Sequence, residues 1–185
     1  MKKSFLLFAA IAMSVSFSTA VMAQTSATVA ATPAGARLIV PMAITQDHSL
    51  HFGTINLLGN STAGTVVLSA VDAGRSYTGG GIIGSSIAPV AANAAYHVTG
   101  TYNATYALTL PSTAITVTET IGSTTMTITN FKANFNTATE ASSSNTSTLS
   151  ASGADYFTVG GTLNVASGQQ GGIYAGTFPV IVDYN

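Results

Sequence analysis

The chain ends in the stretch GIYAGTFPVIVDYN (residues 172–185), and this stretch decides the fold class. Its even-numbered positions carry only glycines and large apolar or aromatic residues, whereas the odd-numbered positions are mixed. Alternation with a period of two is typical of a β-strand that has one face on an apolar core. The stretch therefore predicts a terminal strand with Tyr174, Phe178, Val180, Val182 and Tyr184 on its inward face.

The same alternation recurs upstream, and no window beyond the first 23 residues sustains a helical period. Eight to ten short strands with turn-rich connections predict an all-β fold, an antiparallel β-sandwich of immunoglobulin-like or pilin-like type. The inward parity changes between Ile128 and Phe131, which predicts a bulge near Thr129–Asn130. The predicted inward residues are Leu38, Val40, Met42, Ile44, Leu50, Phe52, Val66, Leu68, Ala70, Ala94, Tyr96, Val98, Tyr106, Leu108, Leu110, Ile115, Val117, Met126, Ile128, Phe131, Ala133, Phe135, Phe157, Val159, Leu163 and Val165.

The first 23 residues have the pattern of a cleaved export signal. Lys2 and Lys3 precede an uncharged apolar stretch, and Val21-Met22-Ala23 supplies the small or apolar residues that a signal peptidase reads. The alternative is a membrane anchor, but serines interrupt the stretch, and a span needs about 20 continuous apolar residues. We expect cleavage after Ala23, no stable membrane insertion afterwards, and a bacterial protein of the periplasm, cell surface or extracellular space.

The composition excludes several classes of partner. Only 6% of residues are charged, and removing Lys2 and Lys3 leaves three basic residues against six acidic ones, a formal charge of −3. So weak a charge predicts no binding to nucleic acid. Since the chain has no cysteine, its stability must come from burial and strand pairing rather than disulfides.

No constellation of residues in the sequence suggests catalysis. His48 and His51 lie three residues apart, so on a strand they point to opposite faces, and His97 alternates away from its apolar neighbours. A zinc site needs three or four convergent ligands. The six acidic residues are isolated, and no nucleophile motif is present. We therefore expect a protein that is not an enzyme and holds no metal or cofactor.

The terminal strand resembles that of subunits assembled by the chaperone–usher pathway, with a glycine fourteen residues from the end (Gly172) and a penultimate aromatic residue (Tyr184). In such subunits this strand pairs with a periplasmic chaperone, and an N-terminal extension of another subunit complements the fold. The resemblance places that extension in residues 24–36. The alternation repeated from Arg37 onward predicts a single domain in 37–185. It implies a strand-complementation interface formed by Ala27, Val29, Ala31, Gly172, Tyr174, Phe178, Val180, Val182 and Tyr184.

Two further motifs extend the resemblance to nearly the whole mature chain. Leu50-His51-Phe52-Gly53 is like the L-x-F-G element of spore-coat-U-type pilins. Together with Pro41-Met42-Ala43-Ile44 and the Gly172–Tyr184 ending, it is similar to a bacterial family known only as domain of unknown function 4402. The chain departs from many pilins in lacking a disulfide, and its arm presents alanines and is interrupted by Pro33 and Gly35.

These patterns leave two functional hypotheses. The first is a secreted structural subunit, pilin-like or fimbria-like, that associates with itself or with homologous subunits by β-strand complementation. The second is a self-complete monomeric module that binds a glycan or surface ligand, with Tyr77, Tyr96, Tyr102 and Tyr106 as a platform, although the alternation places Tyr96 and Tyr106 in the core. The last strand is equally explained as a central strand of a complete sandwich. Pro179 favours an edge strand, because proline donates no ladder hydrogen bond.

Overall fold

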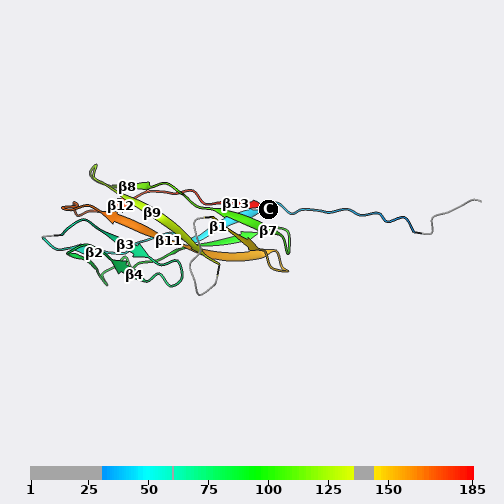
Figure 1. Cartoon of the computed structure of the whole chain (residues 1–185), viewed down its shortest axis with the longest axis horizontal. Coiled ribbons are helices and arrows are strands. Elements are labelled where there is room, and N and C mark those ends of the chain that lie inside the picture. The colour runs from blue at the N-terminus through cyan, green and yellow to red at the C-terminus, as the bar shows by residue number, and fades with distance from the viewer. Residues whose placement is uncertain (1–30, 60, 136–143) are drawn as a thin grey trace, which may run out of the picture. The chain divides into compact units, whose positions relative to one another are not determined.

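The computed structural model describes residues 31–59, 61–135 and 144–185. The chain divides into two compact units, residues 1–37 and 38–185. The described part of the first unit, residues 31–37, is exposed and contains no strand. All strands belong to the second unit, which we call the β-domain (Figure 1).

The β-domain is an all-β, antiparallel, sandwich-like fold, and no helix occurs among the described residues. Every pair of neighbouring strands is antiparallel, as the alternating sequence pattern predicts. No described segment is therefore a helix long and apolar enough to cross a bilayer. The strands in chain order are β1 Ala43–His48, β2 Ile55–Leu57, β3 Gly64–Leu68, β4 Arg75–Tyr77, β5 Ile82–Gly84, β6 Ala94–Thr99, β7 Thr105–Thr109, β8 Ile115–Glu119, β9 Thr125–Asn134, β10 Ser144–Thr148, β11 Ala154–Val165, β12 Tyr174–Ala175 and β13 Ile181–Tyr184.

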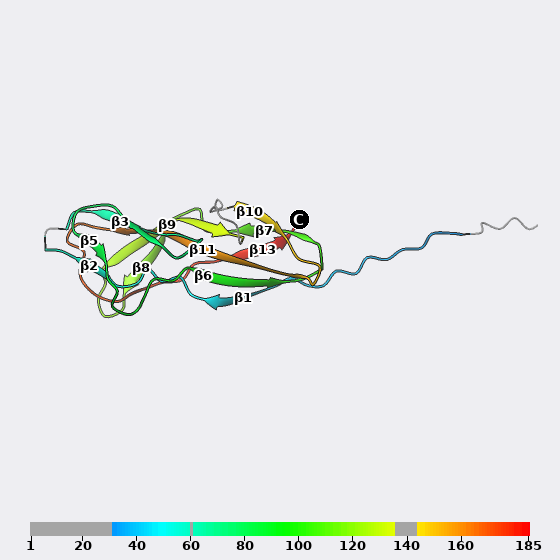
Figure 2. The same ribbon diagram turned by 90° about the horizontal axis from the view of Figure 1, so that it is seen from below.

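Strand β11 organises the large sheet. It pairs with β6 and then β3 along one side, and with β9 along the other. The sheet runs β1-β6-β11-β9-β8-β12, with β4 beside β3. A three-stranded sheet has the order β10-β7-β13, and β2 and β5 form a small ribbon (Figure 2). The first strand of the chain and the last strand thus occupy the margins of two different sheets.

The predicted bulge in β9 is confirmed. Thr129 pairs with Thr162 and Lys132 pairs with Gly160, so Asn130 and Phe131 together oppose one residue of β11. Asn130 adopts a positive φ of 50°, a conformation that asparagine tolerates better than most residues. The extra residue restores the inward direction after Ile128, which allows Phe131 to enter the core.

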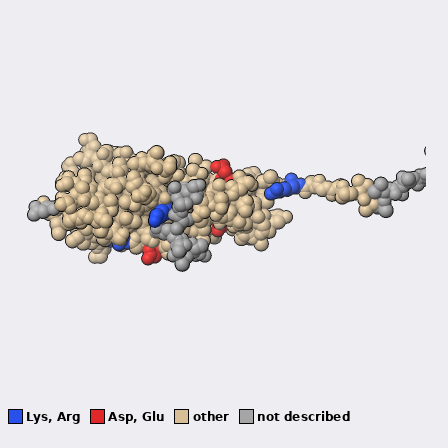
Figure 3. Space-filling view, in the orientation of Figure 1, with Lys and Arg blue, Asp and Glu red and all other residues tan. Residues whose placement is uncertain are grey.

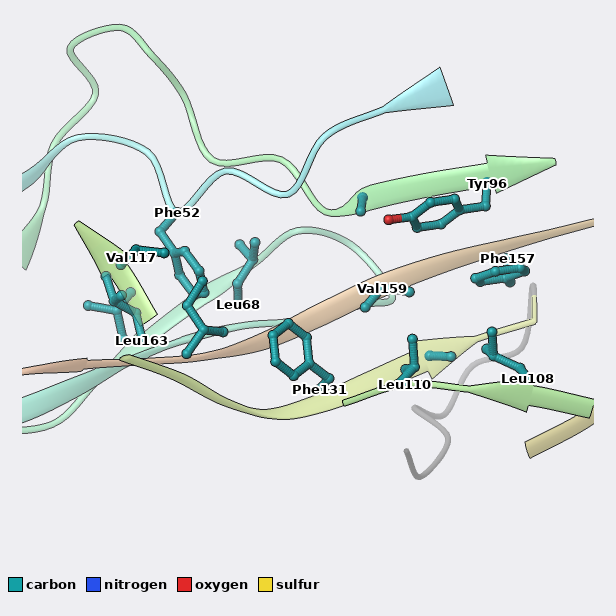
Figure 4. Packing of buried hydrophobic residues seen from close by; sticks show 14 of the residues in the cluster. Phe52, Leu68, Tyr96, Leu108, Leu110, Val117, Phe131, Phe157, Val159 and Leu163 are labelled. Atoms are coloured by element: carbon teal, nitrogen blue, oxygen red, sulfur yellow. The ribbon is translucent and has the colours of Figure 1, made fainter. Parts of the chain in front are cut away.

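The core is a single apolar cluster between the sheets (Figure 4). Its largest members include aromatic rings in contact, with Tyr96 stacked on Phe157 at 5.1 Å and Phe135 tilted against the same ring at 5.6 Å. One polar link also spans the two sheets, because the Tyr106 hydroxyl donates to Asp155 Oδ2 at 2.9 Å. The predicted inward residues that are buried are Phe52, Val66, Leu68, Ala70, Ala94, Tyr96, Val98, Tyr106, Leu108, Leu110, Val117, Ile128, Phe131, Ala133, Phe157, Val159, Leu163 and Val165.

The start of the first strand differs from the prediction. The alternation begins at Leu38, but β1 begins at Ala43, and the side chains of Leu38 and Val40 are 84% and 55% exposed. The backbone N–H of Val40 donates to the side chain of Thr101 at 2.7 Å instead of joining a ladder. Residues 38–42 thus alternate with a period of two, although no described strand pairs with them.

Candidate strand-pairing edges

The last strand, β13, is an edge strand. It pairs with β7, whose other side is taken by β10, and no described strand pairs with the opposite side of β13. The alternative of a central strand is therefore wrong for the described residues. An edge strand presents a row of unpaired backbone groups, which serve as a template for another strand.

The register shows which backbone groups face this free edge. Asn185 donates its N–H to the carbonyl of Thr105 at 3.2 Å, and it lies opposite Thr105 when the β7–β13 register is extended. Hydrogen-bonded and non-hydrogen-bonded pairs alternate in an antiparallel ladder. The odd-numbered residues therefore face β7, and the N–H and C=O groups of Val182 and Tyr184 face outward.

Pro179 precedes an edge strand, as predicted, but its missing N–H does not lie on the free side of that strand. Extending the same register by two residues places Pro179 opposite Pro111, and neither residue has an N–H to donate. The two prolines end the β7–β13 ladder, which explains why β13 begins only at Ile181. Because the missing N–H of Pro179 lies on the β7 side, it does not interrupt the free edge.

The inward side chains beside this edge are only half-buried. Phe178, Val180, Val182 and Tyr184 all pack against the core cluster, and the Phe178 ring lies 4.7 Å from that of Phe131. Their counterparts on interior strands are almost completely covered. The predicted face is thus inward, but no described segment covers its outer flank.

A second free edge belongs to β1. This strand pairs with β6, and no described strand lies on its other side. Met42 and Ile44 pack on the core cluster and are half-buried, like the residues of β13. Two open edges with half-buried apolar side chains therefore border the core, one from each end of the domain sequence.

Tyr184 joins the two edge segments at one end, an arrangement that we call the Tyr184 clasp. Its hydroxyl donates to the carbonyl of Val40 at 2.6 Å and accepts the N–H of Thr101 at 2.6 Å. A side chain on Gly100 would collide with this hydroxyl. The sequence identified Tyr184 but missed its partners, because they lie 83 and 144 residues away and form no local pattern.

The other end of the C-terminal segment lies against Glu119. Tyr174 pairs with Glu119 in the β8–β12 ladder, and the Glu119 side chain is only 8% exposed, on the same face of β8 as Val117. A Cβ on Gly172 would lie 2.6 Å from Glu119 Cγ and Oε1. The glycine that the sequence pattern singled out therefore allows the C-terminal segment to approach the Glu119 side chain closely.

The structure does not place the predicted arm on this edge. Ala27 and Val29 lie outside the described residues, and Ala31 is exposed and outside any strand. The other predicted interface residues share the C-terminal segment, from Gly172 and Tyr174 at one end to Tyr184 at the other. The arm's part in the interface stays a prediction.

The L-x-F-G motif has an architectural explanation that the sequence did not reveal. The guanidinium of Arg75 donates to the carbonyls of Phe52, Thr54 and Ser85 at 3.0–3.1 Å and so ties two loops together. Gly53 has a φ of 76°, and a Cβ there would lie 2.8 Å from Arg75 Nη1. Gly53 is thus needed for both its backbone conformation and the space it leaves to Arg75.

The four tyrosines considered as a ligand platform do not share a surface, and Tyr96 and Tyr106 lie in the core as the alternation predicts. Tyr96 and Tyr106 are 7% and 0% exposed within the core, and Tyr77 packs beneath Arg75. Tyr102 is exposed on a turn. The four rings therefore form no common surface, because period-two alternation directs two of them inward.

The histidines are dispersed. His51 Nδ1 accepts the N–H of Gly53 at 2.8 Å, whereas the His97 ring stacks on Tyr156 with centroids 4.3 Å apart. The described residues contain no group of three histidine or acidic side chains arranged to hold a metal ion. The face of the molecule in Figure 3 carries few charged side chains.

Comparison with known proteins gives one match. A family model described as "Domain of unknown function (DUF4402)" matches residues 42–184, which is nearly the whole β-domain. No curated protein matches the chain. No solved structure matches it either.

Proposed function

We propose that this chain, a member of the DUF4402 family, is a secreted, non-enzymatic structural subunit that assembles by β-strand complementation. The proposal comes from the geometry of the chain itself. The product is a pilus-like or fimbria-like fibre on the bacterial surface. The observation that carries the proposal is the free edge of β13, where unpaired backbone groups lie beside half-buried apolar side chains.

An added strand would supply backbone hydrogen-bond partners and apolar cover to the free edge of β13. Its backbone would pair with the outward N–H and C=O groups of Val182 and Tyr184, and alternate side chains would cover Phe178 and Val180. Completing the burial of a half-covered apolar side chain contributes about 1 kcal/mol, half of the value for full burial. Three or four such residues, together with the backbone hydrogen bonds, give an incoming strand a substantial driving force.

The arm of a second copy is the proposed donor. Ala27, Val29 and Ala31 alternate with the period of a strand, and described residues 31–37 are exposed without a strand partner of their own. A periplasmic chaperone that inserts a strand at the same edge would protect it before assembly. Homologous subunits with similar arms are further candidate partners.

The test compares two triple variants of the mature chain, residues 24–185. Replacing Ala27, Val29 and Ala31 by aspartate places charges on the inward face of the arm and should abolish oligomers. Replacing Ser26, Thr28 and Ala30 by aspartate adds the same charge to the same arm on the outward face and should leave them.

Light scattering coupled to size exclusion measures the mass of each variant, and thermal unfolding checks that each is folded. Wild-type protein that is monomeric at every concentration would refute the proposal and favour the self-complete binding module. Equal loss of oligomers in both variants would refute the strand-like alternation of the arm.

A further inference from the structure

We propose that a groove on the outer face of the large sheet, the face opposite the core, binds a neutral sugar ring such as the end of a glycan chain. The groove lies over β9 and β11, which are interior strands of this sheet, so it is separate from the free edges of β1 and β13. Because a monomer would display the groove as well as a fibre would, the inference goes beyond the proposed function and does not depend on it.

The groove has a volume of about 250 Å³. Ile128 and Leu163 are buried in the core, so alternation directs Thr127 and Asn164, which lie opposite each other, to the outer face. A volume slightly below the usual range of ligand pockets favours one small ring over a larger ligand. The lining consists of Thr125, Met126 and Thr127 of β9, Asn164 and Val165 of β11, and Ala166 and Gln169 of the loop that follows β11.

Asn164 holds its side-chain amide in a fixed orientation. Its Nδ2 donates to the carbonyl and the hydroxyl of Thr127, both at 3.2 Å, and to the hydroxyl of Thr129 at 3.1 Å. Because these contacts occupy the amino group, the planar amide turns its carbonyl oxygen, Oδ1, away from Thr127 and Thr129. Oδ1 is therefore a preformed acceptor for a ligand hydroxyl.

The loop after β11 fixes the amide of Gln169 in a similar way. Its Nε2 donates to the hydroxyl of Tyr174 at 2.8 Å and to the carbonyl of Thr125 at 3.4 Å. The Tyr174 hydroxyl donates in turn to the carbonyl of Gln170 at 2.7 Å, and the N–H of Gln169 donates to the carbonyl of Ala166 at 3.3 Å. These bonds anchor the loop and leave Gln169 Oε1 as a second acceptor whose position is set before a ligand binds.

The lining matches a neutral sugar in charge and in polarity. None of the lining residues is charged, so nothing in the groove would balance the charge of an ionic ligand. The two amide oxygens accept hydrogen bonds from ring hydroxyls, and the hydroxyl of Thr125 can both donate and accept. Met126, Val165 and Ala166 make up the apolar part of the lining. A sugar ring has hydroxyls around its rim and C–H groups on its faces, so it complements both parts.

The neighbouring strand continues the same chemistry beyond the groove. On β8, Thr118 lies opposite Thr125 and Thr116 lies opposite Thr127, and both β8 threonines are exposed. Their hydroxyls extend a neutral polar surface from the groove across the sheet. The rest of a glycan chain therefore has a compatible surface on which to lie.

The first test is saturation-transfer NMR on the mature chain, a method that detects weak binding to a monomer and to a large assembly alike. The probes are the methyl glycosides of glucose, galactose and mannose. Each is titrated to about 50 mM, well above the dissociation constant of about 1–10 mM expected of a small ligand held by few hydrogen bonds. At least one probe should show saturable binding, and no saturable binding by any of the three would overturn the proposal.

The second test locates the bound sugar with two arginine variants. Ala166 is exposed in the lining, and Ser76 is exposed on the outer face of β4, outside the groove. Ala166→Arg should fill the groove and raise the dissociation constant at least about 10-fold, the equivalent of losing one or two hydrogen bonds. Ser76→Arg adds the same side chain to the same face and should leave the affinity unchanged. Equal affinities of the two variants would overturn the assignment to this groove.

The third test addresses the amide of Gln169. Gln169→Leu should weaken sugar binding about 5- to 10-fold, because a hydrogen-bond acceptor is lost. Gln170→Leu is the matched control, because Gln170 is exposed and its side chain is not part of the lining. Equal affinities of these two variants would overturn the role of Gln169 as an acceptor.

Thermal unfolding of each variant shows whether a weakened affinity reflects a misfolded domain. Variants that melt like wild type but differ in sugar binding support the groove. A wild-type protein that binds a sugar but never assembles would refute the proposed function and leave this inference standing. A protein that assembles but binds none of the three sugars would have the opposite consequence.

Discussion

Replacing Tyr184 by phenylalanine removes a single oxygen atom and keeps the ring. That oxygen donates to the carbonyl of Val40 and accepts the N–H of Thr101, both at 2.6 Å. Losing both hydrogen bonds and leaving a part-buried N–H unpaired costs about 1–3 kcal/mol. Since the two bonds connect the last strand to the start of the domain, we expect the variant to lose this amount of unfolding free energy.

Urea denaturation and thermal unfolding of the mature chain measure the loss. For a protein of this size, 1 kcal/mol lowers Tm by about 2–4 °C. Tyr102→Phe is the matched control, because its ring is 67% exposed and should be replaceable without effect. Surface substitutions usually change the free energy of unfolding by no more than about 0.5 kcal/mol. A Tyr184→Phe variant that differs from wild type by no more than this would refute a stabilising clasp.

Three further predictions concern stability. In thermal unfolding, Gly172→Ala should destabilise the fold by about 1–3 kcal/mol, because the new methyl group collides with Glu119. Gly171 has open space around it, so Gly171→Ala should leave the stability unchanged. Arg75→Gln should cost about 2–4 kcal/mol in urea denaturation, since three carbonyls lose a charged donor. Burial raises the pKa of Tyr106 above its ordinary value of 10, so the unfolded chain loses this proton at a lower pH than the folded chain. The free energy of unfolding should therefore fall as the pH rises above about 10. Thermal melts at several pH values should show a smaller decline for Tyr106→Phe.

Local patterning was sufficient to predict most of the core. The side chains of a strand alternate whatever its neighbours are, so the inward face is readable from the residues themselves, as it is for Val66 and Leu68. The same rule located the bulge of β9, because an extra residue must reverse the parity. It failed at Leu38, which follows the alternation but pairs with no described strand.

The candidate site was predictable only in part. The sequence identified Gly172, Tyr174 and Tyr184 as exceptional within the terminal segment. It did not reveal that Gly172 makes room for Glu119, or that Arg75 binds the carbonyl of Phe52. These contacts join residues from different strands and loops, and no spacing rule connects them.

The sequence by itself determined that this protein is built from alternating strands, which side chains they bury, and where one strand bulges. Only the tertiary structure decided that β1 and β13 are edges among the described strands, because an edge is defined by a missing neighbour rather than by any residue in the strand. It also decided that Tyr184 closes on Val40, 144 residues away. Periodicity is a local property of the chain, whereas pairing depends on which distant segments the folded backbone brings together.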